Sequence, residues 1–183
     1  MVGVLDDFNN RMTLDYKNAG DVIVLIGEQQ NDIASSEYLH KLKGVEYSPA
    51  PHFELDEEFA VQKFVASIIH EKLINSAHDI SEGGLAVTLL EKGFNRNLGF
   101  YVHADFDIRK DAFWFGEAQS RVVVTCSKLN AENIKHKAAS NNIPVTIIGT
   151  VTNTEIKVNG ESWGSINDWK NKYDTAIEKL LIA

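Results

Sequence analysis

The run "DVIVLIG" at residues 21–27 constrains the fold more than any other stretch of this sequence. It is continuously apolar from Val22 to Ile26, so it offers no polar side to solvent. Such a pattern is typical of a strand covered on both faces. A turn signal, "KNAG", precedes the run, and Gly27 ends it. The run therefore predicts a sheet with helices packed on both of its faces.

The clearest helix is predicted between Asp56 and Asn75. Its apolar residues recur at spacings of three and four, which places them on one side: Val61, Phe64, Val65, Ile68, Ile69 and Leu73. The acids at its start suit the positive end of a helix: Asp56, Glu57 and Glu58. A second helix is expected from about Glu82 to Lys92, with Ser81 as its N-cap and Gly93 near its end.

Two further helices are predicted, "NAENIKHKAASNN" (130–142) on the surface and a tail over 167–181. The tail is expected to dock on the sheet through side chains at helical spacing: Trp169, Tyr173, Ile177, Leu180 and Leu181. A loop leading into a short helix is expected over 31–44.

Four more strands are predicted: 98–106, 120–127, 143–152 and 155–160, the last two as a hairpin through Thr152 to Thr154. Strands and helices interleave, with at least one antiparallel pair. The predicted fold is therefore α+β, a three-layer α/β/α unit with a mixed β-sheet. No repeat or interior linker is visible, so a single domain over 1–183 is expected.

Composition excludes several classes of protein. The 183 residues, 44% of them hydrophobic, suffice for one core or for one lobe of a larger assembly. A net charge of −8 argues against a nucleic-acid binder. The single cysteine, Cys126, rules out an internal disulfide, and its apolar surroundings predict a buried structural thiol. No stretch is long enough to span a membrane and no signal peptide follows Met1, so a cytoplasmic location is expected.

The stretch "SAHDISEGGLAV" (76–87) places two acids and two glycines at a strand-to-helix junction. Unpaired N–H groups at a helix start attract anions, and Gly83 and Gly84 would let a phosphate approach the backbone. A carboxylate beside phosphate is favourable if Mg²⁺ lies between them, which makes Asp79 a candidate metal ligand. The alternative is that Asp79 and Ser81 cap the helix while the glycines allow tight packing. The pattern alone slightly favours this second interpretation.

A second polar block, "GEAQSR" (116–121), directly precedes an apolar strand. Glu117 is suited to a metal or a sugar hydroxyl, Gln119 to an amide or phosphate, and Arg121 to a phosphate or carboxylate, with Ser120 beside them. The alternative is an edge loop in which Arg121 pairs with Glu117.

Other polar and aromatic residues suggest no separate chemistry. His78 is expected to be held by a hydrogen bond, and Phe113, Trp114 and Phe115 are expected in the core. The sequence has no His spacing typical of a metal site, no mononucleotide phosphate loop and no recognisable Ser/His/Asp order. If this protein handles ATP, the usual apparatus lies elsewhere.

In combination, these segments resemble a known family. "AGDVIVLIG", "SSEYL", "SAHDISEGGLAVTLLE", "GEAQSRVVV" and "IPVTIIGTV" occur in the order typical of the C-terminal lobe of the aminoimidazole ribonucleotide synthetase superfamily. Within it the chain is most similar to the phosphoribosylformylglycinamidine synthase family. The resemblance covers nearly the whole chain and implies the fold of the C-terminal domain of aminoimidazole ribonucleotide synthetase.

The resemblance also implies a larger context. Synthases of this family contain two copies of a two-lobe unit, and "HDISEGG" places this chain as the last lobe of the second copy, excised from a longer chain. Residues 1–15, which include "VGVLDD", would be the interlobe junction. The implied partners are the preceding ATP-handling lobe and, in the short form of the enzyme, a separate glutaminase subunit and a small accessory subunit.

The implied reaction is the ATP-dependent amidation of formylglycinamide ribonucleotide in purine biosynthesis. The resemblance makes Asp79 a Mg²⁺ ligand and Ser81 a contact to the phosphates of ATP or ADP. Glu117, Gln119 and Ser120 match a block that contacts substrate in the first copy, but Ala118 stands where the family commonly has Ser. The second copy holds a structural nucleotide, so we expect no catalytic residue here and no activity of the isolated lobe.

Two alternatives remain open from the sequence. One is a lobe of another superfamily member: aminoimidazole ribonucleotide synthetase, thiamine-phosphate kinase or selenophosphate synthetase. "GEAQSR" favours the synthase over these. The other is a stand-alone, nonenzymatic binding or dimerisation module, and a homodimer of the isolated lobe is a related hypothesis. A long upstream reading frame would support the fragment.

Overall fold

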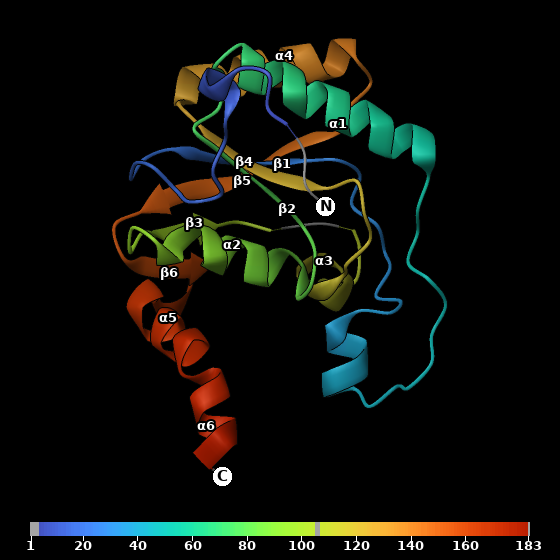
Figure 1. Ribbon diagram of the computed structural model, residues 1–183, viewed down its shortest axis with the longest axis vertical. Helices are drawn as coiled ribbons and strands as arrows, with labels where there is room; N and C mark the ends of the chain where they lie inside the picture. Colours follow the sequence, from blue (N-terminus) through green and yellow to red (C-terminus); the bar gives the residue numbers. More distant parts are fainter. Residues whose placement is uncertain (1–3, 105–106, 183) are drawn as a thin grey trace.

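Seven strands form one mixed sheet in the computed structural model, which describes residues 4–104 and 107–182 (Figure 1). The strand order is β2-β4-β1-β5-β3-β6-β7. The strands are β1 (Val22–Ile26), β2 (Ser76–Asp79), β3 (Gly99–Val102), β4 (Val122–Cys126), β5 (Val145–Thr152), β6 (Glu155–Val158) and β7 (Glu161–Ser165). The helices are η1 (Phe8–Asn10), η2 (Tyr38–Leu42), α1 (Leu55–His70), α2 (Gly84–Phe94), α3 (Lys110–Phe115), α4 (Lys128–Ser140), α5 (Ile166–Asp174) and α6 (Ala176–Ile182).

Strand β1 lies between β4 and β5 and pairs antiparallel with both. Its side chains alternate between two cores: Val22, Val24 and Ile26 belong to one, and Ile23 and Leu25 to the other. All five are buried. Full burial of one such side chain contributes roughly 1.5–3 kcal/mol. The prediction of a strand covered on both faces is confirmed.

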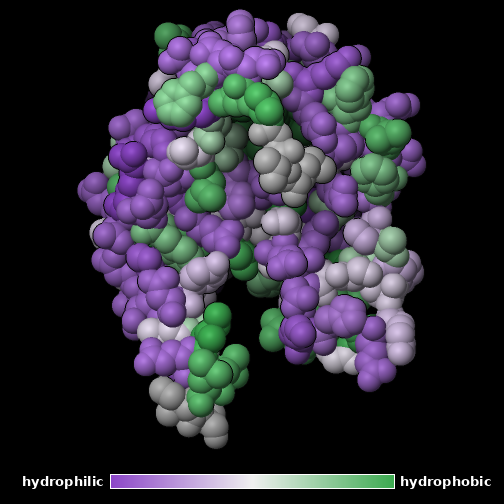
Figure 2. Space-filling view, in the orientation of Figure 1, coloured by the Kyte–Doolittle hydropathy of each residue, from purple (hydrophilic) through white to green (hydrophobic). Residues whose placement is uncertain are grey.

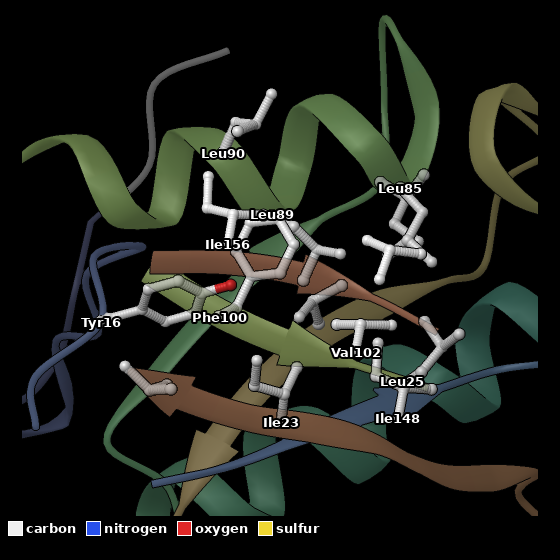
Figure 3. Packing of buried hydrophobic residues seen from close by; sticks show 14 of the residues in the cluster. Tyr16, Ile23, Leu25, Leu85, Leu89, Leu90, Phe100, Val102, Ile148 and Ile156 are labelled. Atoms are coloured by element: carbon white, nitrogen blue, oxygen red, sulfur yellow. The ribbon is translucent and has the colours of Figure 1, made fainter. Parts of the chain in front are cut away.

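Two sets of helices form the outer layers of the molecule. Helices α1 and α4 pack on one face of the sheet through Phe64, Ile68 and Ile134. On the other face, α2 lies over the sheet through Leu85 and Leu89, and α3 and α5 flank it (Figures 1 and 3). The predicted three-layer α/β/α fold with a mixed sheet is therefore confirmed.

The predicted hairpin between 143–152 and 155–160 is wrong. Strand β3 lies between β5 and β6, antiparallel to β5 and parallel to β6. Strand β6 instead forms a hairpin with β7 through Asn159 and Gly160. Both have positive φ, 49° and 85°. Asn-Gly is the preferred pair for a tight hairpin turn because both residues tolerate that conformation.

The predicted docking of the tail is correct only for its first half. Ile166 is buried and Trp169 packs against the core, but Thr175 ends α5 and a new helix begins. On α6, Ile177 and Leu180 are 73% and 80% exposed. Figure 2 shows an apolar patch near the lower left end of the molecule, where α6 projects from the body in Figure 1. The spacing predicted helical structure in the tail, but it did not predict which of these side chains are buried.

Several element boundaries differ from those predicted. Helix α1 ends at His70. Lys72, two residues later, has a φ of 56°, a backbone conformation that does not occur within an α-helix. Ser81 is not the N-cap of α2, because that helix begins at Gly84 with Gly83 in the cap position. Strand β3 ends at Val102, and positions 105 and 106 of the predicted strand lie outside the described residues, as do residues 1–3.

Two expectations from composition can be checked. Cys126 is buried, and burial raises the pKa of its thiol to about 12, so the predicted structural thiol is confirmed. None of the helices within 4–104 and 107–182 combines the length and apolar content needed to cross a bilayer.

Candidate functional site

The pairing of β2 with β4 brings the two polar blocks together. The strands are antiparallel with Asp79 opposite Val122, so the residues that follow β2 lie beside those that precede β4. The Ile80 N–H donates to the Arg121 carbonyl at 3.0 Å. Segments some forty positions apart thus form one side of a common site.

A groove of about 580 Å³ opens at this junction. It is lined by both polar blocks and by the start of α1: Glu58, Val61, Gln62, Val65, Asp79, Ile80, Ser81, Glu82, Glu117, Gln119, Ser120, Arg121 and Val122. The structure therefore brings six of the eight candidate residues around one groove, while Gly83 and Gly84 are not among its lining residues. Glu58 and Gln62 were not predicted as site residues. Glu58 had been explained by the helix dipole alone.

Glu117 ties three segments together at the groove. Its Oε1 accepts hydrogen bonds from the backbone N–H of Gly83 at 2.9 Å and of Glu37 at 2.8 Å. A carboxylate therefore already sits at the start of α2, where unpaired N–H groups attract anions. Its Oε2 has no hydrogen-bond partner among the residues that the structure describes, so it remains available to a ligand.

The two glycines at this junction are required by the backbone. Gly83 and Gly84 have φ of 82° and 67°, in the left-handed region that favours glycine. A Cβ on Gly84 would lie 2.7 Å from the Cα of Phe115 and from the Trp114 carbonyl oxygen. Tight packing against α3 thus accounts for Gly84, and the positive φ together with the nearby Val87 side chain accounts for Gly83. A role of theirs in phosphate binding stays a prediction, and the Gly83 N–H already donates to Glu117.

Arg121 stabilises the second polar block through hydrogen bonds to its backbone. Its side chain is buried, with Nε donating to the Ala118 carbonyl at 3.0 Å and Nη2 to the Gly116 carbonyl at 2.7 Å. Burial lowers its pKa to about 10, while Asp32 and Glu117 act to raise it, so it stays charged at neutral pH. Its buried Nη1 has no partner within the described part of the chain. The expected pairing with Glu117 is electrostatic, not a hydrogen-bonded ion pair.

Ala118 is itself buried, 1% exposed, and does not line the groove. The Ser that the resemblance implies at this position would therefore add no hydroxyl to the groove of this chain.

Ser120 connects the block to α1 and to the end of β1. Its Oγ donates to Glu58 Oε2 at 2.7 Å. Its carbonyl oxygen lies so close to Gly27 that a Cβ there would be only 2.0 Å away. Gly27 also has a φ of 100°, which explains the glycine that ends the apolar run.

Asp79 presents an exposed carboxylate to the groove. Its side chain is 76% exposed and meets only His78 Nδ1, at a long 3.4 Å. Within 4–104 and 107–182, no three His, Cys, Asp or Glu side chains are grouped so that they could hold a metal ion unaided. The donor set fits Mg²⁺ only if phosphate oxygens and water complete it, which is the coordination Mg²⁺ prefers.

His78 is held as predicted, by a hydrogen bond between its Nε2 and Glu91 Oε2 at 2.9 Å. Glu91 also accepts from the Tyr173 hydroxyl at 3.3 Å, which links α2 to α5. Among the aromatic residues expected in the core, Phe113 is buried, Trp114 packs against the core, and Phe115 stacks on Tyr38 at 5.0 Å.

Comparison with known proteins now identifies the family. The model described as AIR synthase related protein, C-terminal domain, matches residues 18–160. The chain belongs to this family. The resemblance inferred from its motifs is thereby confirmed.

Curated relatives of this chain are phosphoribosylformylglycinamidine synthase subunits PurL. The subunit from Alkaliphilus metalliredigens is 35% identical over 190 residues, which cover 100% of this chain and 26% of the relative. The subunit from Chlorobaculum tepidum is 35% identical, covering 99% and 25%. The chain thus spans about a quarter of the length of these relatives.

Solved structures share the fold of this family member. T. maritima PurL complexed with FGAR matches with a TM-score of 0.72 at 16% identity, covering 89% of this chain and 30% of that one. Thiamine-monophosphate kinase from Stenotrophomonas maltophilia matches with a TM-score of 0.53 at 17% identity, covering 82% and 54%. At such identities both likenesses concern the fold alone.

Proposed function

We propose that this chain is the C-terminal lobe of a phosphoribosylformylglycinamidine synthase of the short form, within its second two-lobe copy. The complete enzyme would convert formylglycinamide ribonucleotide, ammonia from glutamine and ATP to the amidine, ADP and phosphate. The lobe would contribute a nucleotide-binding groove and be inactive alone. Residues 1–15 would be the junction to the preceding ATP-handling lobe.

One observation carries the proposal: the "HDISEGG" and "GEAQSR" blocks of a PurL-like sequence line a single open groove, with Asp79 exposed in it. Similarity to PurL subunits across the whole chain supports the assignment to this enzyme. Structures of T. maritima PurL complexed with ATP and with ADP support a nucleotide as the ligand.

In this proposal Asp79 holds Mg²⁺, and the Ser81 hydroxyl donates to a phosphate oxygen. When bound, Mg²⁺ neutralises charge on the phosphates. The Gln119 amide would offer hydrogen bonds to the rest of the ligand, and the Ser120 hydroxyl, which donates to Glu58, would accept one. Glu117 orients the start of α2. Gly83 and Gly84 shape the turn that presents Ser81.

The charge of the groove explains why the lobe alone would bind nucleotide poorly. Four carboxylates line it, from Glu58, Asp79, Glu82 and Glu117, against one buried cation, Arg121. A polyphosphate is repelled unless cations accompany it. Mg²⁺ supplies part of that charge, and the preceding lobe would supply the rest.

The remaining partners follow from the same assignment. A complex named PurLQS from Thermotoga maritima includes a structural relative of this chain. A separate glutaminase subunit and a small accessory subunit would therefore assemble with the complete enzyme, in the cytoplasm.

Retention of ADP by the complete synthase tests the proposal. Asp79→Asn should speed the loss of bound ADP, measured by rapid gel filtration and nucleotide analysis. Asp174→Asn is the matched control, since Asp174 is an exposed acid that pairs with Lys170 on α5. If both variants retain ADP alike, Asp79 does not serve the nucleotide.

A further inference from the structure

A second cavity, of about 400 Å³, lies near the start of β2 and the end of α2, whereas the groove adjoins the end of β2 and the turn before α2. Asn75, which precedes β2, and Arg96, which follows α2, both line it. Helix α2 has 11 residues, which at about 1.5 Å per residue separates its ends by about 16 Å. The second cavity is therefore distinct from the groove.

Cations dominate this cavity. Arg11, Lys17 and Arg96 line it, together with the amides of Asn9 and Asn75. No carboxylate is among its lining residues. A concentration of positive charge is notable in a chain whose net charge is −8, because most of the surface would repel anions.

Asp15 lies beneath the cavity and arranges two of these cations. It accepts hydrogen bonds from Arg96 Nε at 2.7 Å and Thr13 Oγ1 at 2.7 Å, and it pairs with Lys17 Nζ at 2.6 Å. Burial raises the pKa of Asp15, but these hydrogen bonds outweigh that effect and hold the pKa well below its ordinary value. With Asp15 ionised at neutral pH, the three cations and this carboxylate sum to a charge of +2.

Hydrogen-bond donors remain on both arginines. Arg96 uses Nε for Asp15, and its two terminal nitrogens have no partner in the described part of the chain. Arg11 stacks on the Phe8 ring at 3.9 Å and donates from Nη1 to the Phe8 carbonyl at 3.4 Å, while its Nη2 has no partner among the described residues. Two guanidinium groups with donors to spare therefore line one cavity.

We propose that this cavity binds the phosphate group of a small ligand between Arg11 and Arg96. A planar guanidinium presents paired N–H donors that match two oxygens of a phosphate, and it is more weakly hydrated than an ammonium group. A phosphate monoester carries close to two negative charges at neutral pH, which matches the net charge of the cavity. This site is independent of the function proposed for the groove.

Phosphate binding to the 183-residue chain tests this inference. The backbone amide resonances are followed by NMR while inorganic phosphate or acetate is added at constant ionic strength. We expect phosphate to cause saturable shifts around the cavity and acetate to bind more weakly. Arg11→Gln should weaken phosphate binding about tenfold, the effect of losing one charge-assisted hydrogen bond. Lys128→Gln, an exposed cation at the start of α4, should change binding less than about twofold.

Arg11 is the informative position because, unlike Lys17 and Arg96, it does not neutralise buried Asp15, so its replacement leaves the fold intact. The proposal is overturned if phosphate causes no saturable shift, or if the Arg11 and Lys128 variants bind alike. Acetate binding as tightly as phosphate would overturn the assignment to phosphate.

Discussion

Lys92 is a fully buried amine on α2, and replacing it with methionine should remove a measurable part of the pH dependence of folding. Its Nζ donates to the Leu14 carbonyl at 2.9 Å, to Ser76 Oγ at 2.9 Å and to the Val123 carbonyl at 3.3 Å. Burial, helped by the charge of Lys17 and partly opposed by Asp15, lowers the pKa of Lys92 from 10.5 to about 7. Methionine has a similar volume and no proton to lose.

The sign and size of the effect follow from proton linkage. At pH 9 the unfolded chain keeps the Lys92 proton, whereas the folded chain has lost it. Since the unfolded state binds more protons above pH 7, the free energy of unfolding rises with pH. A folded pKa of about 7 gives an increase of about 2 kcal/mol between pH 7 and pH 9. Well below pH 7 both states are protonated and the contribution is constant.

Urea unfolding monitored by tryptophan fluorescence at pH 7 and pH 9 measures this difference. The wild-type chain should gain about 2 kcal/mol more than the Lys92→Met variant over that interval. Lys128→Met, at an exposed position, should behave as the wild type. Other groups, such as buried Cys126, titrate equally in all three chains and cancel. Parallel behaviour of the wild type and Lys92→Met would refute the reasoning.

Three further predictions concern the groove. Gly84→Ala should destabilise the chain by about 3 kcal/mol in urea unfolding, because the new Cβ meets Phe115 at a positive φ. Gly44→Ala has the same φ of 67° with nothing within 4 Å, so it should cost only about 1 kcal/mol; equal costs would contradict the packing argument. Glu117→Ala should cost about 2 kcal/mol by leaving the Gly83 N–H unpaired, and Glu117→Gln, which keeps an acceptor, should cost less than half of that. If the two Glu117 variants are equally stable, the hydrogen bonds contribute little. The purified chain should release no phosphate from Mg·ATP, and any turnover would contradict the lobe assignment.

The sequence was sufficient to predict helices and strands whose hydrophobic pattern is contained within the element itself. The apolar run of β1 predicted a strand covered on both faces, and the spacing along α1 predicted a helix. The position of β3 between β5 and β6 was not predictable in this way, since Gly99–Val102 fits an edge or a central strand equally well. The hairpin was predicted through Thr152 to Thr154, whereas the Asn159-Gly160 pair, which had been included in the predicted last strand, forms the turn between β6 and β7.

The sequence predicted which residues belong to the candidate site, but not which of them contact one another. The motifs identified Asp79 and Glu117, but only the pairing of β2 with β4 shows that they line one groove. That the Glu117 carboxylate occupies the start of α2 could not be inferred, because it depends on a side chain that crosses between segments. The burial of Lys92 was also missed, since a lysine near a helix end is usually exposed.

A structure of the proposed complete synthase, determined with Mg²⁺ and ADP, tests the central claim most directly. The account predicts that the metal and the phosphates lie in the groove, with Asp79 bound to the metal and Ser81 to a phosphate oxygen. It would be contradicted if the nucleotide lay elsewhere, or if protein side chains filled the groove and left Asp79 without a ligand.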